Sequence, residues 1–286
     1  MDKFGISGAI LSVSSPGTAF GDLSKARSMA RQVNEYTAKI VSQYPERFGF
    51  FAFLPMPDLD ASIEEARYAL DVLKADGVVL LGNARGKYFS EPEFHPLLKE
   101  LNSRKTVIFV HPNYLPGPQV PGLPPFVADF LLDTVRAATL YVTTGAAAEY
   151  KDLELILAHA GAFIPYVASR IGMAATAIGG GGLAQAGVSD ASIEPLKRFY
   201  VDTALSTSPY AFPSLLTFTD PSHITFGSDF PFAPDAVGAY FAGELDKQFS
   251  NDTAALAQIN SGTAAELFPR FSKQCMAGAA MGRDEL

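Results

Sequence analysis

The chain has 286 residues, of which 48% are hydrophobic and 18% are charged, and this composition excludes an intrinsically disordered protein. A net charge of −8 without a basic run argues against binding to nucleic acid or to an anionic membrane surface. The single cysteine, Cys275, excludes an internal disulfide, and with no long apolar run and no signal peptide the sequence predicts a cytoplasmic protein.

In chain order, short apolar runs alternate with longer segments whose apolar residues recur every three or four positions. The short runs predict strands and the longer segments predict helices. The predicted strands cover residues 5–14, 48–54, 77–81, 106–110, 153–158, 199–204 and 223–226. The predicted helices cover residues 22–44, 60–73, 94–101, 126–144, 164–178, 210–218, 235–249 and 252–267.

This alternation indicates an α/β fold built from seven βα units. Because the strand runs are almost continuously apolar, we expect a parallel sheet that is covered on both faces. Regular βα repeats of this length are typical of a TIM-type (β/α)8 barrel, which here lacks its first strand. We expect a single domain over residues 1–286, truncated at its N-terminus relative to a complete barrel, with a flexible tail at residues 269–286.

Several polar residues lie where the predicted strands end. His111 and His159 each close a strand, and Asp229 follows the last strand, while Asn83 and Asp202 lie at the ends of two others. In barrels of this type, catalytic residues collect at the C-terminal ends of the strands. Neutral imidazole and carboxylate are the ligands that suit Zn²⁺ or a similar divalent ion. The sequence therefore predicts a metal or acid–base site.

Each of these residues also has a structural interpretation. A single histidine at a strand end is about as often a hydrogen-bonded structural residue as a ligand, so the prediction depends on His111, His159 and Asp229 occurring together. Asp202 either fixes the loop after its strand or orients an imidazole. Arg170, on the helix after His159, either lies on a solvated face or clamps a substrate carboxylate.

Several segments resemble the amidohydrolase-related decarboxylases, the relatives of aminocarboxymuconate semialdehyde decarboxylase and of the fungal 6-methylsalicylate decarboxylases. The similarity extends from about residue 4 to residue 268, and the order and spacing of the segments carry it. These segments are VNEY (33–36), YPERFGFFAFLPMPD (44–58), VIFVHP (107–112), DTVRAA (133–138), LAHAGAFIPYVASR (157–170), YVDTA (200–204) and FGSDFPF (226–232).

The resemblance implies a metal-dependent barrel enzyme that removes CO2 from a small aromatic, salicylate-type carboxylic acid in secondary metabolism, without an organic cofactor. It assigns a divalent metal, Zn²⁺ or else Mn²⁺, to His111 and Asp229, and acid–base chemistry to His159 and Asp229. It implies that Arg170 reaches the substrate of a neighbouring subunit, so we expect a homodimer or homotetramer. The substrate contacts are then Arg170, Asn83 and Phe232, and Asp202 supports the site from behind the metal ligands.

The chain departs from the family pattern in two places. The family supplies two further metal ligands through His-x-His or Glu-x-His on its first strand, and this sequence has no histidine before His95. The family's His-x-Gly-Gly reads His159-Ala160-Gly161-Ala162. The first departure predicts weak metal binding and leaves three hypotheses open. They are a decarboxylase, a metal-dependent hydrolase of a lactone or amide that uses the same residues, and a catalytically impaired remnant.

Overall fold

The computed structural model describes residues 1–17, 22–178 and 189–272. The run of four glycines at residues 179–182 and most of the predicted tail, residues 273–286, lie outside the described residues. Residues 269–271 of that tail form a short 3-10 turn.

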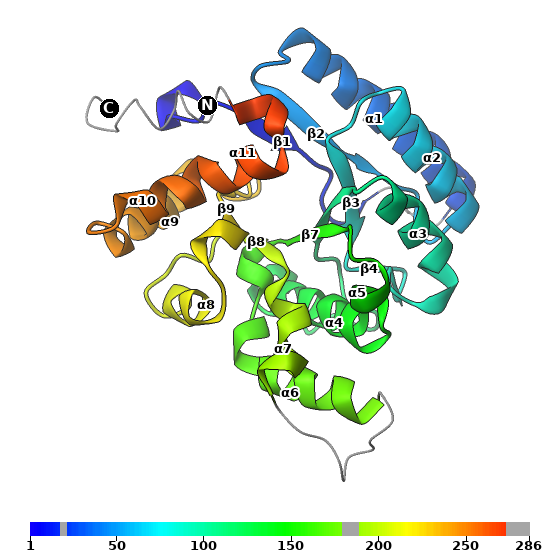
Figure 1. The fold of residues 1–286 in the computed structure, drawn as a ribbon. Coiled ribbons are helices and arrows are strands. Elements are labelled where there is room, and N and C mark those ends of the chain that lie inside the picture. Colours follow the sequence, from blue (N-terminus) through cyan, green and yellow to red (C-terminus); the bar gives the residue numbers. More distant parts are fainter. Residues whose placement is uncertain (18–21, 179–188, 273–286) are drawn as a thin grey trace.

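Seven parallel strands form one curled sheet that makes up most of a barrel (Figure 1). Each strand pairs with its neighbours in the order β1-β2-β3-β6-β7-β8-β9. The strands are β1 (Ala9–Leu11), β2 (Phe48–Phe53), β3 (Gly77–Leu81), β6 (Val107–His111), β7 (Glu154–Leu157), β8 (Tyr200–Asp202) and β9 (Ile224–Thr225). The seven predicted units and the parallel sheet are confirmed, and the sheet has one strand fewer than a closed (β/α)8 barrel.

Eleven α-helices surround the sheet in the described ranges, most of them on its outer side. They are α1 (Leu23–Gln43), α2 (Leu59–Asp71), α3 (His95–Ser103), α4 (Asp129–Thr143), α5 (Ala146–Glu149), α6 (Ile164–Thr176), α7 (Asp190–Lys197), α8 (Phe212–Phe218), α9 (Asp235–Gln248), α10 (Thr253–Ala257) and α11 (Thr263–Leu267). The side chains of Asp22 and Asp58 accept hydrogen bonds from the first turns of α1 and α2, which fixes where these helices begin. No helix in the described ranges is long and apolar enough to cross a membrane.

Three elements were not expected from the sequence, one of them the four-residue helix α5. A short antiparallel hairpin, β4 (Asn83–Ala84) with β5 (Lys87–Tyr88), follows β3 at the C-terminal end of the sheet. It is only two residues long on each side, and such a segment is too short to show a periodic pattern. The third element is α7, which follows the glycine-rich segment and begins at the capping residue Ser189.

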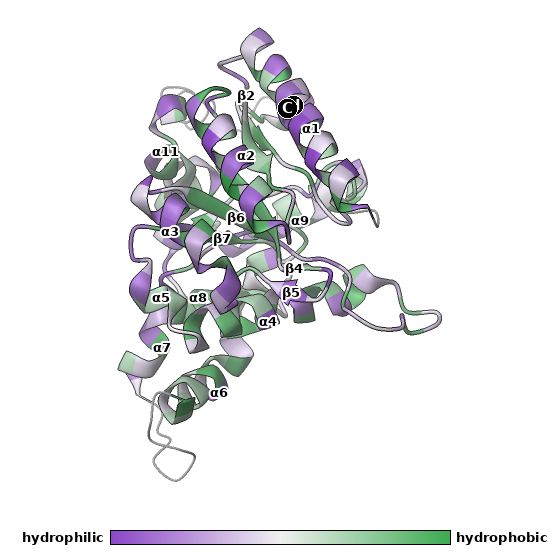
Figure 2. Ribbon diagram, turned by 90° about the vertical axis from the view of Figure 1, so that its right-hand side faces the viewer, coloured by the Kyte–Doolittle hydropathy of each residue, from purple (hydrophilic) through white to green (hydrophobic). Residues whose placement is uncertain are grey.

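The strands are apolar on both faces because each face packs against a different layer. The outer face, including Phe50, Val78 and Ile108, packs against the apolar sides of the helices. The inner face carries Phe51 and Phe109, whose rings stack with their centroids 5.6 Å apart. Figure 2 shows the same division, with hydrophilic residues on the outward sides of α1 and α2 and hydrophobic residues along the strands. This two-layer core explains the continuous apolar runs of the sequence.

The C-terminal segment packs against the inner face of the sheet. Among the described strands, no pairing joins β9 to β1. Phe268, which follows α11, packs against Phe51, and Phe271 belongs to the same inner cluster. Arg270 forms an ion pair with Asp76, just before β3, and donates a hydrogen bond to the carbonyl of Phe48. The end of the described chain is thus anchored to the N-terminal ends of β2 and β3.

Candidate metal centre

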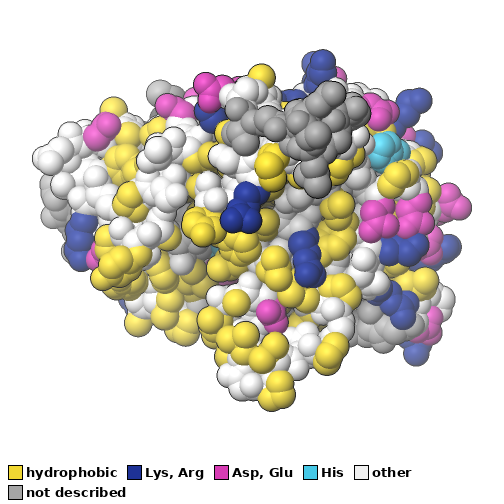
Figure 3. Space-filling view, turned by 90° about the horizontal axis from the view of Figure 1, so that it is seen from below, with side chains coloured by type: hydrophobic (Ala, Val, Ile, Leu, Met, Phe, Trp, Pro, Cys, Tyr) yellow, Lys and Arg dark blue, Asp and Glu magenta, His cyan; other side chains and the backbone are white. Residues whose placement is uncertain are grey.

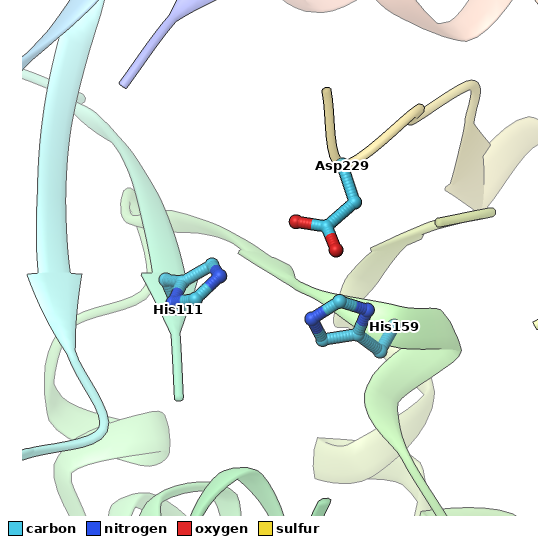
Figure 4. Close-up of side chains that lie close together, drawn as sticks. All are labelled: His111, His159 and Asp229. Atoms are coloured by element: carbon cyan, nitrogen blue, oxygen red, sulfur yellow. The ribbon is translucent and has the colours of Figure 1, made fainter. Parts of the chain in front are cut away.

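Three side chains from separate strands meet at the C-terminal end of the sheet. His111 is the last residue of β6, His159 lies in the turn after β7, and Asp229 lies in the loop after β9. One potential ligand atom from each lies within 4.8 Å of the others, and Figure 4 shows the carboxylate and both imidazoles pointing toward a common space. The structure therefore brings together the three residues on which the sequence prediction depended.

The backbone is constrained at two of these residues. His159 and Asp229 have φ angles of 56° and 55°, in the left-handed region that residues with a Cβ rarely adopt. Ala160 and Ala162, which flank the same turn, also have positive φ angles. Such conformations cost on the order of 1–3 kcal/mol each and persist where the surrounding structure demands them, often at functional sites.

Backbone carbonyl groups fix the tautomers of both histidines. The Nδ1 atom of His111 lies 2.8 Å from the carbonyl oxygen of Pro112, and the Nδ1 atom of His159 lies 3.2 Å from that of Ala204. A carbonyl oxygen can only accept, so each Nδ1 carries the proton. The Nε2 lone pair of each ring is left free, which is the form in which histidine binds a metal ion or takes up a proton.

The electrostatic environment favours neutral imidazole in the buried part of the site. Burial, followed by the nearby His159, lowers the pKa of His111 to about 4. Burial also raises the pKa of Asp229, and His159 opposes this shift. His111 is only 8% exposed, whereas His159 and Asp229 are half-buried. At neutral pH the imidazole of His111 is therefore uncharged.

Asp202 supports the turn that carries His159. Its Oδ1 atom accepts hydrogen bonds from the backbone N–H groups of His159, at 2.8 Å, and Ala204, at 3.0 Å. Burial raises the pKa of the Asp202 carboxyl. Gly227 lies directly against it, and a Cβ atom there would stand 2.9 Å from Cγ of Asp202. Asp202 thus contacts the backbone of His159 and not its imidazole ring.

The predicted substrate contacts lie outside this cluster. Asn83 is buried, and its side-chain amide donates to Asp133 and to the carbonyl of Tyr114 while its oxygen accepts from Gly86. Arg170 is exposed on α6, and Phe232 is 68% exposed in the loop after β9. Their assignment to substrate binding stays a prediction.

Sequence analysis did not identify Asp133, on α4, which is fully buried beneath the loop that follows His111. Its carboxylate accepts hydrogen bonds from the backbone N–H of Asn113 and from the side chain of Asn83, both at 2.8 Å. One signal in the sequence could have identified Asp133, since it lies on the apolar face of a predicted helix. A carboxylate that is buried there requires hydrogen-bond partners.

The donor set fits a divalent metal ion. Two imidazole nitrogens and one carboxylate oxygen form a set that Zn²⁺ accepts, and three protein ligands with an open position are typical of catalytic zinc sites. Within the described ranges, this is the one group of three or more histidine, cysteine or acidic side chains that could hold such an ion. None of its members comes from β1.

A family model for amidohydrolases matches residues 1–270. The chain belongs to the amidohydrolase family. The 6-methylsalicylic acid decarboxylase of Penicillium expansum is 35% identical over 268 residues, which cover 92% of this chain and 82% of that protein. The name of this relative confirms the predicted lineage of decarboxylases, which are carboxy-lyases.

Solved structures have the same fold. A crystal structure described as an amidohydrolase II is 27% identical and superposes with a TM-score of 0.85, covering 94% of this chain and 86% of that one. The dihydroxybenzoic acid decarboxylase of Polaromonas sp. JS666, crystallised with bound manganese and the inhibitor 2-nitroresorcinol, has a TM-score of 0.77 at 23% identity, covering 94% and 83%. The predicted TIM-type architecture of this amidohydrolase chain is confirmed.

Proposed function

We propose that this amidohydrolase removes CO2 non-oxidatively from a small aromatic, salicylate-type carboxylic acid. The observation that carries the proposal is the convergence of His111, His159 and Asp229, whose ligand atoms lie within 4.8 Å of one another. The decarboxylase from Penicillium expansum, which is named for 6-methylsalicylic acid, supports the substrate class. Secondary metabolism is the setting that fits such a substrate.

In this proposal, His111 and Asp229 would hold a divalent metal ion, and the Nε2 atom of the adjacent His159 would stay free for acid–base chemistry. The ion would supply a Lewis acid that polarises oxygen atoms of the substrate. Zn²⁺ suits imidazole nitrogen and carboxylate oxygen, and the manganese in the Polaromonas decarboxylase makes Mn²⁺ the second candidate. Because only His111 and Asp229 would hold the ion, we expect weaker binding than at a site with three or four protein ligands. Metal analysis of the purified protein tests this.

His159 is the proposed proton donor. Its Nδ1 proton is held by the carbonyl of Ala204, so Nε2 is the atom that takes up a proton and delivers it to the ring carbon that bears the carboxylate. As this carbon is protonated, its bond to the carboxyl carbon breaks. The bonding electrons restore the aromatic ring, and CO2 leaves. Asp229, beside His159, stabilises the protonated imidazole before the transfer.

Arg170, Asn83 and Phe232 are proposed to contact the substrate, with Arg170 acting in a neighbouring subunit of a homodimer or homotetramer. Figure 3 shows hydrophobic side chains across much of the face seen from below, the end at which α6 lies. On α6, Tyr166 and Met173 are exposed on either side of Arg170 in the sequence, at 82% and 38%. Tyrosine, methionine and arginine are residue types that are enriched in subunit interfaces.

We also propose that residues 1–286 form a single domain and that the protein is cytoplasmic. The single cysteine fits a reducing compartment such as the cytoplasm. Hydrolysis of a lactone or amide is the second candidate function, because the matching family model is that of amidohydrolases and the same three residues serve that reaction.

The deciding experiment incubates the full chain with carboxyl-labelled 6-methylsalicylate and either Zn²⁺ or Mn²⁺. We expect labelled CO2 and 3-methylphenol. His159→Gln should lower kcat by about 10²- to 10⁴-fold, because it removes the proton donor. Release of CO2 belongs to decarboxylation alone. If no salicylate releases CO2 with either metal while a lactone is hydrolysed, the second function replaces the first.

A further inference from the structure

A single peptide group connects His111 to a buried carboxylate. The carbonyl of Pro112 accepts the hydrogen bond from Nδ1 of His111 at 2.8 Å. The N–H of the same peptide unit, which belongs to Asn113, donates to Oδ2 of Asp133 at 2.8 Å. This peptide bond is not among the cis bonds, so its C=O and N–H point in opposite directions. His111 and Asp133 therefore lie on opposite sides of one polar group.

The surroundings hold this arrangement in place. Asp133 is fully buried on α4, and its other oxygen accepts a hydrogen bond from the side chain of Asn83 at 2.8 Å. The Asn113 side chain donates to the carbonyl of Asn83 and accepts from Ser15, after β1. The N–H of Gly82 donates to the carbonyl of His111 at 2.8 Å. The loops after three strands are thus fixed around one carboxylate.

We propose that Asp133 is a positioning residue that orients and tunes His111 through the Pro112–Asn113 peptide. A metal-binding histidine commonly donates its second N–H directly to a carboxylate or a carbonyl. Here the carbonyl of Pro112 accepts the hydrogen bond. The carboxylate of Asp133 acts on that carbonyl through the N–H at the other end of the same peptide unit. A negative charge on the N–H side polarises the peptide, which makes its oxygen a better acceptor, and chains of hydrogen bonds strengthen one another in this way. The expected result is a fixed ring and a more basic Nε2.

This inference rests on the metal centre of the proposed function, and its first test is independent of metal. Side-chain ¹⁵N NMR of the metal-free full chain at neutral pH should show His111 as the tautomer protonated at Nδ1. The His111→Gln variant identifies the signal by its loss. A wild-type His111 protonated at Nε2 would overturn the proposal, whatever the metal content of the protein.

The second test compares two variants that disturb the connection in different ways. Asp133→Asn removes the charge. In Gly82→Ala the added Cβ atom would stand only 2.3 Å from Oδ2 of Asp133, so the carboxylate would have to move. Gly82→Ala keeps every polar group of the network. For each variant that folds, we expect Zn²⁺ affinity, measured by calorimetric titration, to fall about tenfold or more. The Nδ1–H signal of His111 should also shift or lose occupancy.

Glu65→Gln is the matched control. Glu65 is also a buried carboxylate that accepts hydrogen bonds, from Arg31 and Asn34, but it lies on α2 away from the centre. We expect a loss of stability with unchanged Zn²⁺ affinity and an unchanged His111 signal. If the Asp133→Asn or Gly82→Ala protein behaves like this control, the role of Asp133 is only structural and the proposal fails. If the wild-type chain binds neither Zn²⁺ nor Mn²⁺, the metal centre fails, and the NMR result alone decides the role of Asp133.

Discussion

At the residue scale, the position of His159 depends on one oxygen atom of Asp202. Asp202→Ala leaves two N–H groups, those of His159 and Ala204, without this acceptor, and we expect the free energy of unfolding to fall by about 2–4 kcal/mol. Asp202→Asn keeps an acceptor oxygen and should cost about 1 kcal/mol. Urea denaturation of both variants measures this difference. Equal losses in the two variants would show that charge, and not the acceptor, is what matters.

The residues of the metal centre were predictable to different degrees. His111, His159 and Asp229 could be found because each follows an apolar strand, and parallel strands bring their C-terminal ends to one side. Asp133 could not be assigned a role, since its partners lie 20 and 50 residues away and one of them is a backbone N–H. A sequence pattern records side-chain types at fixed spacings. It does not record which peptide group a buried carboxylate contacts.

At the scale of elements, an ion-pair network joins α2 to α3 and makes their packing pH-dependent. Glu100 on α3 accepts hydrogen bonds from Arg67 on α2 and from Arg104, and these lower the pKa of Glu100 to about 2. Because the pKa of Glu100 is lower in the folded state than its value of 4.5 in the unfolded state, the ionised carboxylate stabilises the fold at pH values above 4.5. This contribution is lost as the pH falls toward 2. The strands and most helices were predicted from periodicity, but this contact between helices was not, because it joins residues 33 positions apart.

Glu100→Gln tests this network. We expect the free energy of unfolding of the variant to be about 1 kcal/mol lower than that of the wild type at pH 7. This difference is smaller than the pKa shift of Glu100 alone would give, because Arg67 is largely exposed and solvent screens its charge. The difference from the wild type should shrink as the pH is lowered from 4.5 to 3. Urea denaturation at several pH values provides the measurement. A difference that is constant over this range would rule out the ionised Glu100 as its source.

At the scale of the whole molecule, the aromatic residues after α11 complete the inner core. Phe271 is 6% exposed and packs in the inner cluster, so Phe271→Ala should lower the free energy of unfolding by about 3–5 kcal/mol. Phe4→Ala, at a position 42% exposed, is the control and should cost less than 1 kcal/mol. Thermal unfolding measures both effects. A Phe271→Ala protein as stable as the control would mean that the C-terminal turn does not support the core.

The ion pair between Arg270 and Asp76 joins residues 194 positions apart. During synthesis on the ribosome, β1, β2 and β3 emerge long before residue 270 does, and their inner faces stay open to water and to chaperones in the meantime. Contacts of such large sequence separation are also slow to form. The nascent chain is therefore most exposed to aggregation and proteolysis before Arg270 and Phe271 are released, and a ribosome stalled just before these residues would hold a sheet whose inner face is still uncovered.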